Sequence, residues 1–145
     1  MFDLDADPGQ IALAFREADG QMFREVVAAR RLPGGLIELL ASPGLVMGCA
    51  EGDVLVLEGS GFHVVRRGPN LCVQAYADPQ FTDEVIARFA AAFDGIGGRV
   101  DAPEHRQFLV VTVAADAGEE AVEALMEELA AGVPGLEWQF GNGSR

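Results

Sequence analysis

Alternating hydrophobic and polar positions characterise the first 68 residues of the chain. Ile11, Leu13 and Phe15 alternate within residues 10–16, which is the period of a half-buried strand. Four further strands are expected, at residues 22–32, 35–41, 53–58 and 62–67. Turns containing glycine or proline separate several of them. Five short strands in succession predict a small antiparallel β-barrel or a curled sheet, because either arrangement protects strand edges.

From residue 70 onward, helical periods alternate with strand periods. An apolar residue recurs at every fourth position from Phe81 to Phe93, which predicts a helix with one buried stripe. Asp78, followed by Pro79, is expected to cap the start of that helix. A second helix is expected after an Asp116 cap, with its buried face formed by Val122, Leu125, Met126 and Leu129.

The element order over residues 70–141 is therefore β-α-β-β-α-β, the ferredoxin-like arrangement, whose first and third strands are central. The strands at 71–76 and 107–114 are the most apolar, whereas the strands that contain Arg99 and Glu137 carry charge, as edge strands do. Both helices would lie on one face of this sheet. The other face then needs cover from the N-terminal strands or from a second subunit.

These patterns predict an α+β protein, with an N-terminal small antiparallel β-barrel or curled sheet followed by a ferredoxin-like half. We divide the chain into a flexible lead-in (1–9), a small all-β subdomain (10–68), a ferredoxin-like α+β subdomain (69–141) and a tail (142–145).

The amino-acid composition limits the kinds of molecule that the protein is expected to bind. Half of the 145 residues are hydrophobic, and the formal net charge is −13. All ten basic residues are arginine, which together with abundant alanine and glycine indicates a GC-rich bacterial genome. Such an acidic chain is expected to bind neither nucleic acid nor a membrane, because phosphate and anionic lipid surfaces require clustered basic residues.

The sequence also indicates a compartment. Asp3, Asp5 and Asp7 stand where a signal peptide would be positively charged. No apolar run approaches the roughly 20 residues of a membrane span. Two cysteines do not make a disulfide scaffold, so we expect a reduced, cytoplasmic protein.

Four polar residues near the junction of the two parts are candidates for ligand binding: Asp53, His63, Arg66 and Arg67. The two arginines could clamp a carboxylate or phosphate, or form salt bridges to the surplus carboxylates. His63 could act as an acid or base, or as a cross-strand polar partner. Asp53 could bind a metal together with Glu51, or belong to the turn before the strand that follows.

Both cysteines are interpreted as packing residues. Cys49 could act as a nucleophile only beside a base such as histidine, and otherwise it packs as a small hydrophobic residue. Cys72 lies in an expected central strand and is interpreted as a core residue.

Two acidic groups remain. Asp101, Glu104 and His105 could bind a metal but lack further ligands at suitable spacing, so we favour a solvated turn. The second expected helix carries an acidic face, formed by Glu119, Glu120, Glu123, Glu127 and Glu128. This face is either solvated or a patch that docks a basic partner. We expect no metal and no cofactor.

Several short motifs fall in a recognisable order: Glu25–Leu32 (EVVAARRL), Pro33–Leu36 (PGGL), Ser42-Pro43, Gly48–Val54 (GCAEGDV) and Phe62–Val65 (FHVV). In this order they resemble the bacterial "domain of unknown function 4265" family of uncharacterised proteins, over roughly residues 10–140. That family usually carries an aromatic pair after the proline, where this chain has Gly44-Leu45. The resemblance implies an architecture and no activity.

From these features we expect a non-enzymatic protein that acts as a small-molecule-binding or regulatory module. The alternative is a protein-interaction partner of immunity or inhibitor type, whose acidic surface blocks a basic target. An enzyme with a site between the two parts, using Cys49, His63 or His105, is least favoured. Sheets of the second type often pair edge to edge in regulatory domains, so a homodimer is kept as an option.

Overall fold

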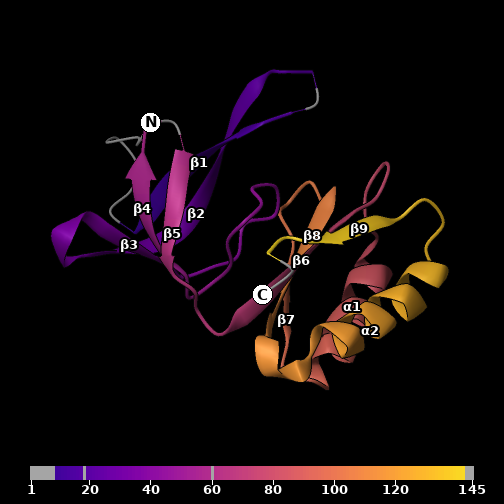
Figure 1. Cartoon of the computed structure of the whole chain (residues 1–145). Coiled ribbons are helices and arrows are strands. Elements are labelled where there is room, and N and C mark those ends of the chain that lie inside the picture. Colours follow the sequence, from indigo (N-terminus) through magenta and orange to yellow (C-terminus); the bar gives the residue numbers. More distant parts are fainter. Residues whose placement is uncertain (1–8, 18, 60, 143–145) are drawn as a thin grey trace.

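The computed structural model describes residues 9–17, 19–59 and 61–142. They form an α+β protein with two antiparallel sheets and two helices (Figure 1). Residues 1–8 of the expected lead-in and 143–145 of the expected tail lie outside this description. No helix in the described part of the chain is long and apolar enough to cross a membrane.

The first sheet is a meander of five strands in sequence order. Its strands are β1 (Gln10–Arg16), β2 (Met22–Leu32), β3 (Leu36–Leu39), β4 (Val54–Glu58) and β5 (Gly61–Arg66). All five expected strands are present, with bounds within two residues of those expected. Their inward side chains form the first core, which includes Ile11, Leu13, Val27, Leu39 and Leu55.

This sheet is curled but does not close. The first part of β2 pairs with β1 as far as Ala28, and its second part, from Ala29, pairs with β3. The outer strands β1 and β5 approach each other without pairing. The prediction of a closed barrel is therefore wrong. The strand β3 has only four residues, and the chain after it leaves the sheet instead of lengthening this strand.

The second sheet has the order β7-β8-β6-β9, so β6 and β8 are central and β7 and β9 are edges, as expected. Its strands are β6 (Asn70–Tyr76), β7 (Arg99–Asp101), β8 (Phe108–Ala114) and β9 (Glu137–Phe140). The helices α1 (Asp83–Asp94) and α2 (Glu119–Ala131) lie together on one face of it (Figure 1). The second core fills the space between, with Leu71, Val73, Phe89, Phe93, Leu109, Val111, Val122 and Met126 fully buried.

Both helices begin later than the sequence predicted, so Asp78 and Asp116 are not their caps. The N-cap of α1 is Thr82, whose hydroxyl accepts a hydrogen bond from the Val85 N–H. Just before it, the Phe81 N–H donates to the Arg106 carbonyl at 2.7 Å, which holds residues 78–81 in a non-helical course.

At α2, a short 3₁₀ turn (Ala115–Ala117) contains Asp116, and the helix starts only after Gly118. Gly118 has a φ of 91°, a left-handed conformation that glycine adopts without steric cost. This residue redirects the chain from the turn into the helix. Of the four residues expected on the buried face of α2, Val122, Met126 and Leu129 are buried and Leu125 is partly buried against the same core.

Residues 42–52, here called the covering segment, lie between the two sheets (Figure 1). They cover the face of the second sheet that is turned away from the helices, where Cys72 and Val110 pack with Ala50. The sequence analysis expected this cover from the N-terminal strands or a second subunit. Instead, the connection between β3 and β4 provides it.

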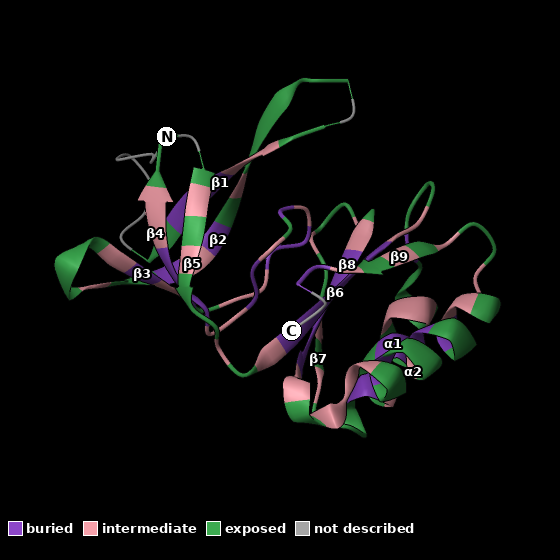
Figure 2. Ribbon diagram, viewed as in Figure 1, coloured by how far each residue is buried: buried purple, intermediate pink, exposed green. Residues whose placement is uncertain are grey.

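The covering segment contacts both cores at once. Val46 and Cys49 are buried in the first core, whereas Ala50 packs on the second sheet. The segment approaches the second sheet tightly at Gly44, where a Cβ atom would lie 2.1 Å from the Phe108 ring. Buried residues accordingly continue from the strands into this connection, while the outer sides of the helices and the far end of the β1–β2 hairpin are exposed (Figure 2).

Candidate functional site

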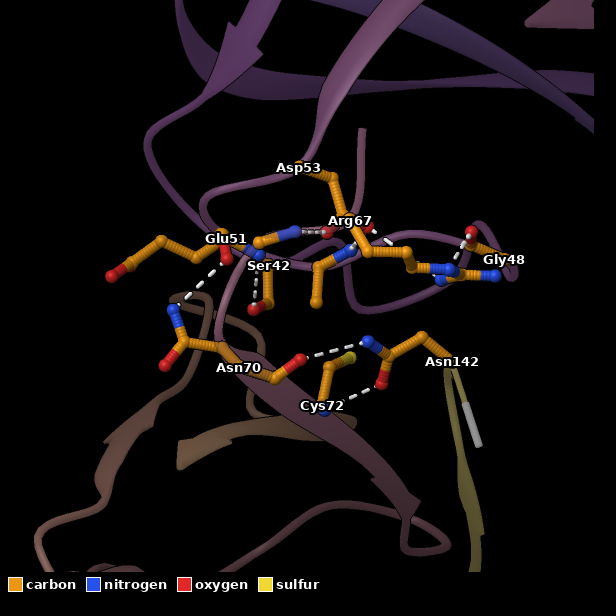
Figure 3. A network of polar contacts seen from close by, with 10 residues as sticks. Ser42, Gly48, Glu51, Asp53, Arg67, Asn70, Cys72 and Asn142 are labelled. Atoms are coloured by element: carbon orange, nitrogen blue, oxygen red, sulfur yellow. Dashed lines mark hydrogen bonds and ion pairs between the residues drawn. The ribbon is translucent and has the colours of Figure 1, made fainter. Parts of the chain in front are cut away.

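Asp53 anchors the junction between the two halves. It is fully buried, one residue before β4 begins. One carboxylate oxygen accepts a hydrogen bond from the Gly68 N–H at 2.7 Å, and the other accepts from the Ala50 N–H at 3.0 Å. The Arg67 guanidinium lies 3.7 Å from the same carboxylate (Figure 3). These partners compensate a buried charge, so Asp53 holds the chain together and does not face a ligand.

Glu25 holds the covering segment to the first sheet. Its carboxylate accepts hydrogen bonds from three consecutive backbone N–H groups, those of Gly44 at 2.7 Å and of Leu45 and Val46 at 3.0 Å. The sequence analysis did not identify this role. The available signal was a lone acidic residue in front of the apolar run Val26–Ala29 of β2.

Gln74 holds the same segment to the second sheet from the other side. The side-chain amide of this fully buried residue donates to the Pro43 carbonyl at 3.2 Å and to the Val46 carbonyl at 2.9 Å. Its oxygen accepts from the Tyr76 hydroxyl at 3.1 Å and from the Gln139 amide at 3.2 Å. Burial raises the pKa of Tyr76, so its hydroxyl remains protonated and can donate at neutral pH.

Asn142 closes the network at the C-terminal end of the described chain. Its carbonyl oxygen accepts from the Cys72 N–H at 2.8 Å, and its amide donates to the Asn70 carbonyl at 3.0 Å (Figure 3). The residue is buried, although the sequence analysis assigned it to the tail. It follows the last residue of β9, and its side chain bonds the backbone of β6 where β9 no longer pairs with that strand.

The two cysteines are free thiols buried at this junction. Burial raises the pKa of Cys72 to about 12, and burial followed by the charge of Asp53 raises the pKa of Cys49 still further. Both are protonated at neutral pH, whereas nucleophilic attack requires a thiolate. They pack as the sequence analysis interpreted them.

The histidines lie on different parts of the molecule. His63 is exposed on β5, opposite Val56. His105 is in the turn before β8, where its ring packs against Phe108 and its Nδ1 accepts from the Gln107 N–H.

A cleft of about 640 Å³ opens at the junction, beside the Asp53 anchor. Its wall is formed by the end of β3, the end of the covering segment, and the link from β5 to β6. The lining residues are Glu38, Leu39, Leu40, Glu51, Gly52, Arg66, Arg67, Gly68, Pro69 and Asn70. Of the four sequence-predicted site residues, the structure thus brings Arg66 and Arg67 to the cleft, leaves Asp53 buried beneath it, and leaves His63 outside its lining.

Both carboxylates of the cleft wall are paired with arginines from outside the lining. Glu38 pairs with Arg30 across neighbouring strands. Glu51 accepts from the Arg99 guanidinium at 2.5 Å, which ties the covering segment to β7. Hydrogen bonds to Glu51 and then to Asp101 raise the pKa of Arg99 above its ordinary value. Asp101 is the last residue of β7 and pairs with Arg99, whereas Glu104 and His105 lie exposed in the turn that follows, as the sequence predicted.

The described residues contain no group of three His, Cys, Asp or Glu side chains placed to hold a metal ion. On α2, Glu120, Glu123, Glu127 and Glu128 are exposed, as expected for a solvated or docking face, whereas Glu119 at the start of the helix is partly buried.

Two small sheets joined by a shared covering segment, with a cleft at their junction, define an α+β protein of two halves. The model of the family described as "Domain of unknown function (DUF4265)" matches residues 25–134. The chain therefore belongs to this family, as its motifs indicated.

One solved structure has a similar fold, described as "Novel crystal structure of a hypothetical protein from Neisseria gonorrhoeae". The match covers 94% of this chain and 95% of that one, with a TM-score of 0.69 and 13% sequence identity. It shows the fold alone. No curated protein matches the chain.

Proposed function

We propose that this protein is a non-enzymatic module that binds a small molecule in the cleft at the junction of its two halves. The observation that carries the proposal is the cleft itself. Its volume, about 640 Å³, lies within the range of roughly 300–1,000 Å³ that small-molecule sites occupy. Its lining combines charged groups with apolar surface from Leu40 and Pro69.

The position of the cleft supports a regulatory role. A ligand there would touch the end of β3, the covering segment and the link between the halves, and would therefore be sensed by both sheets. The β-α-β-β-α-β order of the second half supports grouping it with ferredoxin-like domains, many of which bind regulatory ligands. The exposed edges of that sheet, β7 and β9, are where a second copy would pair in a homodimer.

The chemistry of the junction supports binding rather than catalysis. The thiols of Cys49 and Cys72 are buried and protonated, and each histidine is exposed on a different half. General acid–base catalysis requires the base within hydrogen-bond reach of the proton that it removes. The proposal assumes the cytoplasm, where free thiols stay reduced.

A thermal-shift screen with amino acids, nucleotides and organic acids tests the proposal, because a ligand that binds only the folded state raises Tm. A ligand should raise the Tm of the wild type but not that of Leu40→Trp, which places a large ring in the cleft. The matched control is Val26→Trp, on exposed β2 surface outside the cleft lining, which should respond like the wild type. A library without a single hit, or a hit that Leu40→Trp leaves unchanged, contradicts the proposal.

The exposed glutamates of α2 favour a second candidate function, an interaction partner that blocks a basic target. Pull-down from the source lysate at low and high salt tests it. A partner retained at low salt and released at high salt supports this function, and failure to retain any partner at low salt removes its basis.

A further inference from the structure

The arginines of this acidic protein gather at the junction cleft. Four of the ten are placed there: Arg66 and Arg67 in its lining, and Arg30 and Arg99 on the carboxylates of its wall. The acidic surplus lies elsewhere, much of it on α2. Resting on the proposed function, we infer that the ligand is a small organic anion whose carboxylate or phosphate group is bound by Arg66.

Of the two arginines in the cleft lining, Arg66 is the one whose guanidinium is not paired with another group of the described protein. Arg67 donates to the Gly48 carbonyl and lies beside Asp53, so its guanidinium is engaged by the protein. The side chain of Arg66 is exposed and makes no hydrogen bond or ion pair with the described residues. It is therefore the cation of the lining that remains available to a ligand.

The carboxylates of the wall do not compete for it. The Glu38 side chain is held by Arg30 and is only 21% exposed, and the Glu51 side chain is held by Arg99 and is 26% exposed. Asp53 lies beneath the cleft with its own donors. An anion that enters the cleft would thus meet carboxylates already paired with arginines, and the unpaired guanidinium of Arg66.

The geometry of that guanidinium indicates the ligand's group. Arginine presents a planar fork of N–H donors that matches the two oxygens of a carboxylate or phosphate. Leu40, which is 48% exposed and belongs to the same lining, offers apolar surface to the rest of the ligand. The class of ligand is therefore a small oxyanion with an apolar body.

Titration of the ¹⁵N-labelled full chain with butyrate, butyl phosphate and butanamide, followed by NMR, tests the inference. Butyrate and butanamide share a body and differ in charge, and the two anions distinguish carboxylate from phosphate. We expect one or both anions to shift the amide signals of Gly52, Gly68 and Asn70. Arg66→Ala should weaken that binding at least tenfold, because a charge-assisted pair is lost.

Two further variants sharpen the comparison. Arg66→Lys keeps the charge without the fork and should bind with intermediate affinity. Arg88→Ala removes an exposed arginine from α1, outside the cleft, and should bind like the wild type.

Butanamide binding as tightly as butyrate, or anion binding that survives Arg66→Ala, overturns the anion assignment. The absence of any amide shift with either anion at millimolar concentration also overturns it. In each case a hit in the thermal-shift screen that Leu40→Trp abolishes would leave small-molecule binding in the cleft intact. The two proposals therefore fail separately.

Discussion

The carboxylate of Asp53 and the backbone N–H of Gly68 are joined by a 2.7 Å hydrogen bond at the junction of the two halves. It ties the start of β4 to the link that leads into β6. Because Asp53 also accepts from Ala50, the same side chain fixes the end of the covering segment. The walls of the cleft are thus set by one buried carboxylate.

Replacing Asp53 with asparagine should destabilise the fold by about 2–4 kcal/mol, because a buried, charge-assisted set of hydrogen bonds is broken. Urea unfolding followed by circular dichroism measures the change. Asp101→Asn is the matched control: its side chain is 57% exposed, so its pair with Arg99 should contribute less than about 1 kcal/mol. Equal stability of the two variants would contradict the structural role of Asp53.

Gly68→Ala should cost about 2–3 kcal/mol, because the added Cβ would lie 2.4 Å from the backbone carbonyl carbon of Gly52 and force the two backbones apart. Gly61→Ala is the control, since its nearest contact would be an ordinary 3.8 Å. Thermal unfolding of both variants checks the prediction, and a Gly68→Ala protein as stable as Gly61→Ala would refute the close approach.

Glu25→Ala should cost about 2–3 kcal/mol, because three backbone N–H groups of the covering segment lose their acceptor. Hydrogen exchange at Gly44, Leu45 and Val46 should accelerate more than exchange in the β6–β8 pair. Glu58→Ala, at the exposed end of β4, should leave both readouts near wild type. Unchanged protection of the three amides in Glu25→Ala would contradict this anchoring.

Stability should fall as the pH rises above about 9, because the pKa of each buried thiol is raised above its ordinary value of 9.0. Below that pH both states keep the thiol protons and this contribution is fully present. Above it, the unfolded state loses protons that the folded state retains, so unfolding is favoured. At pH 10 the loss is about 1.4 kcal/mol per thiol.

Urea unfolding at pH 8, 9 and 10 measures this loss. Cys72→Ala should show about half of the wild-type decline over that range, because Cys49 alone then contributes. A decline equal in the wild type and in Cys72→Ala would contradict the assignment to the thiols.

The sequence was most informative where contacts are local or periodic. The apolar content of residues 71–76 identified a central strand, and the spacing of Phe81, Phe89 and Phe93 identified the buried stripe at α1. Helix starts were mispredicted, because the hydrogen bond from Phe81 to Arg106 joins segments that no local pattern connects.

The polar junction could not be predicted for the same reason. Glu25 binds residues 19–21 positions away, Gln74 binds Pro43 across 31 positions, and Asn142 binds Cys72 across 70. Each is a single polar residue in an apolar or terminal stretch. In each of these long-range bonds the partner is a backbone group, which carries no sequence signal. Arg66 and Arg67 were found because adjacent arginines are conspicuous in a chain with ten basic residues.

The covering segment has a consequence for how this molecule can be divided. By sequence it belongs to the first half, yet it provides the layer on which Cys72, Gln74 and Thr112 of the second sheet rest. A fragment beginning at residue 69 would expose that sheet face to water, and a fragment ending there would leave the segment without its support. The two halves should therefore melt in one transition, and neither can be exchanged for a relative's without carrying part of the other.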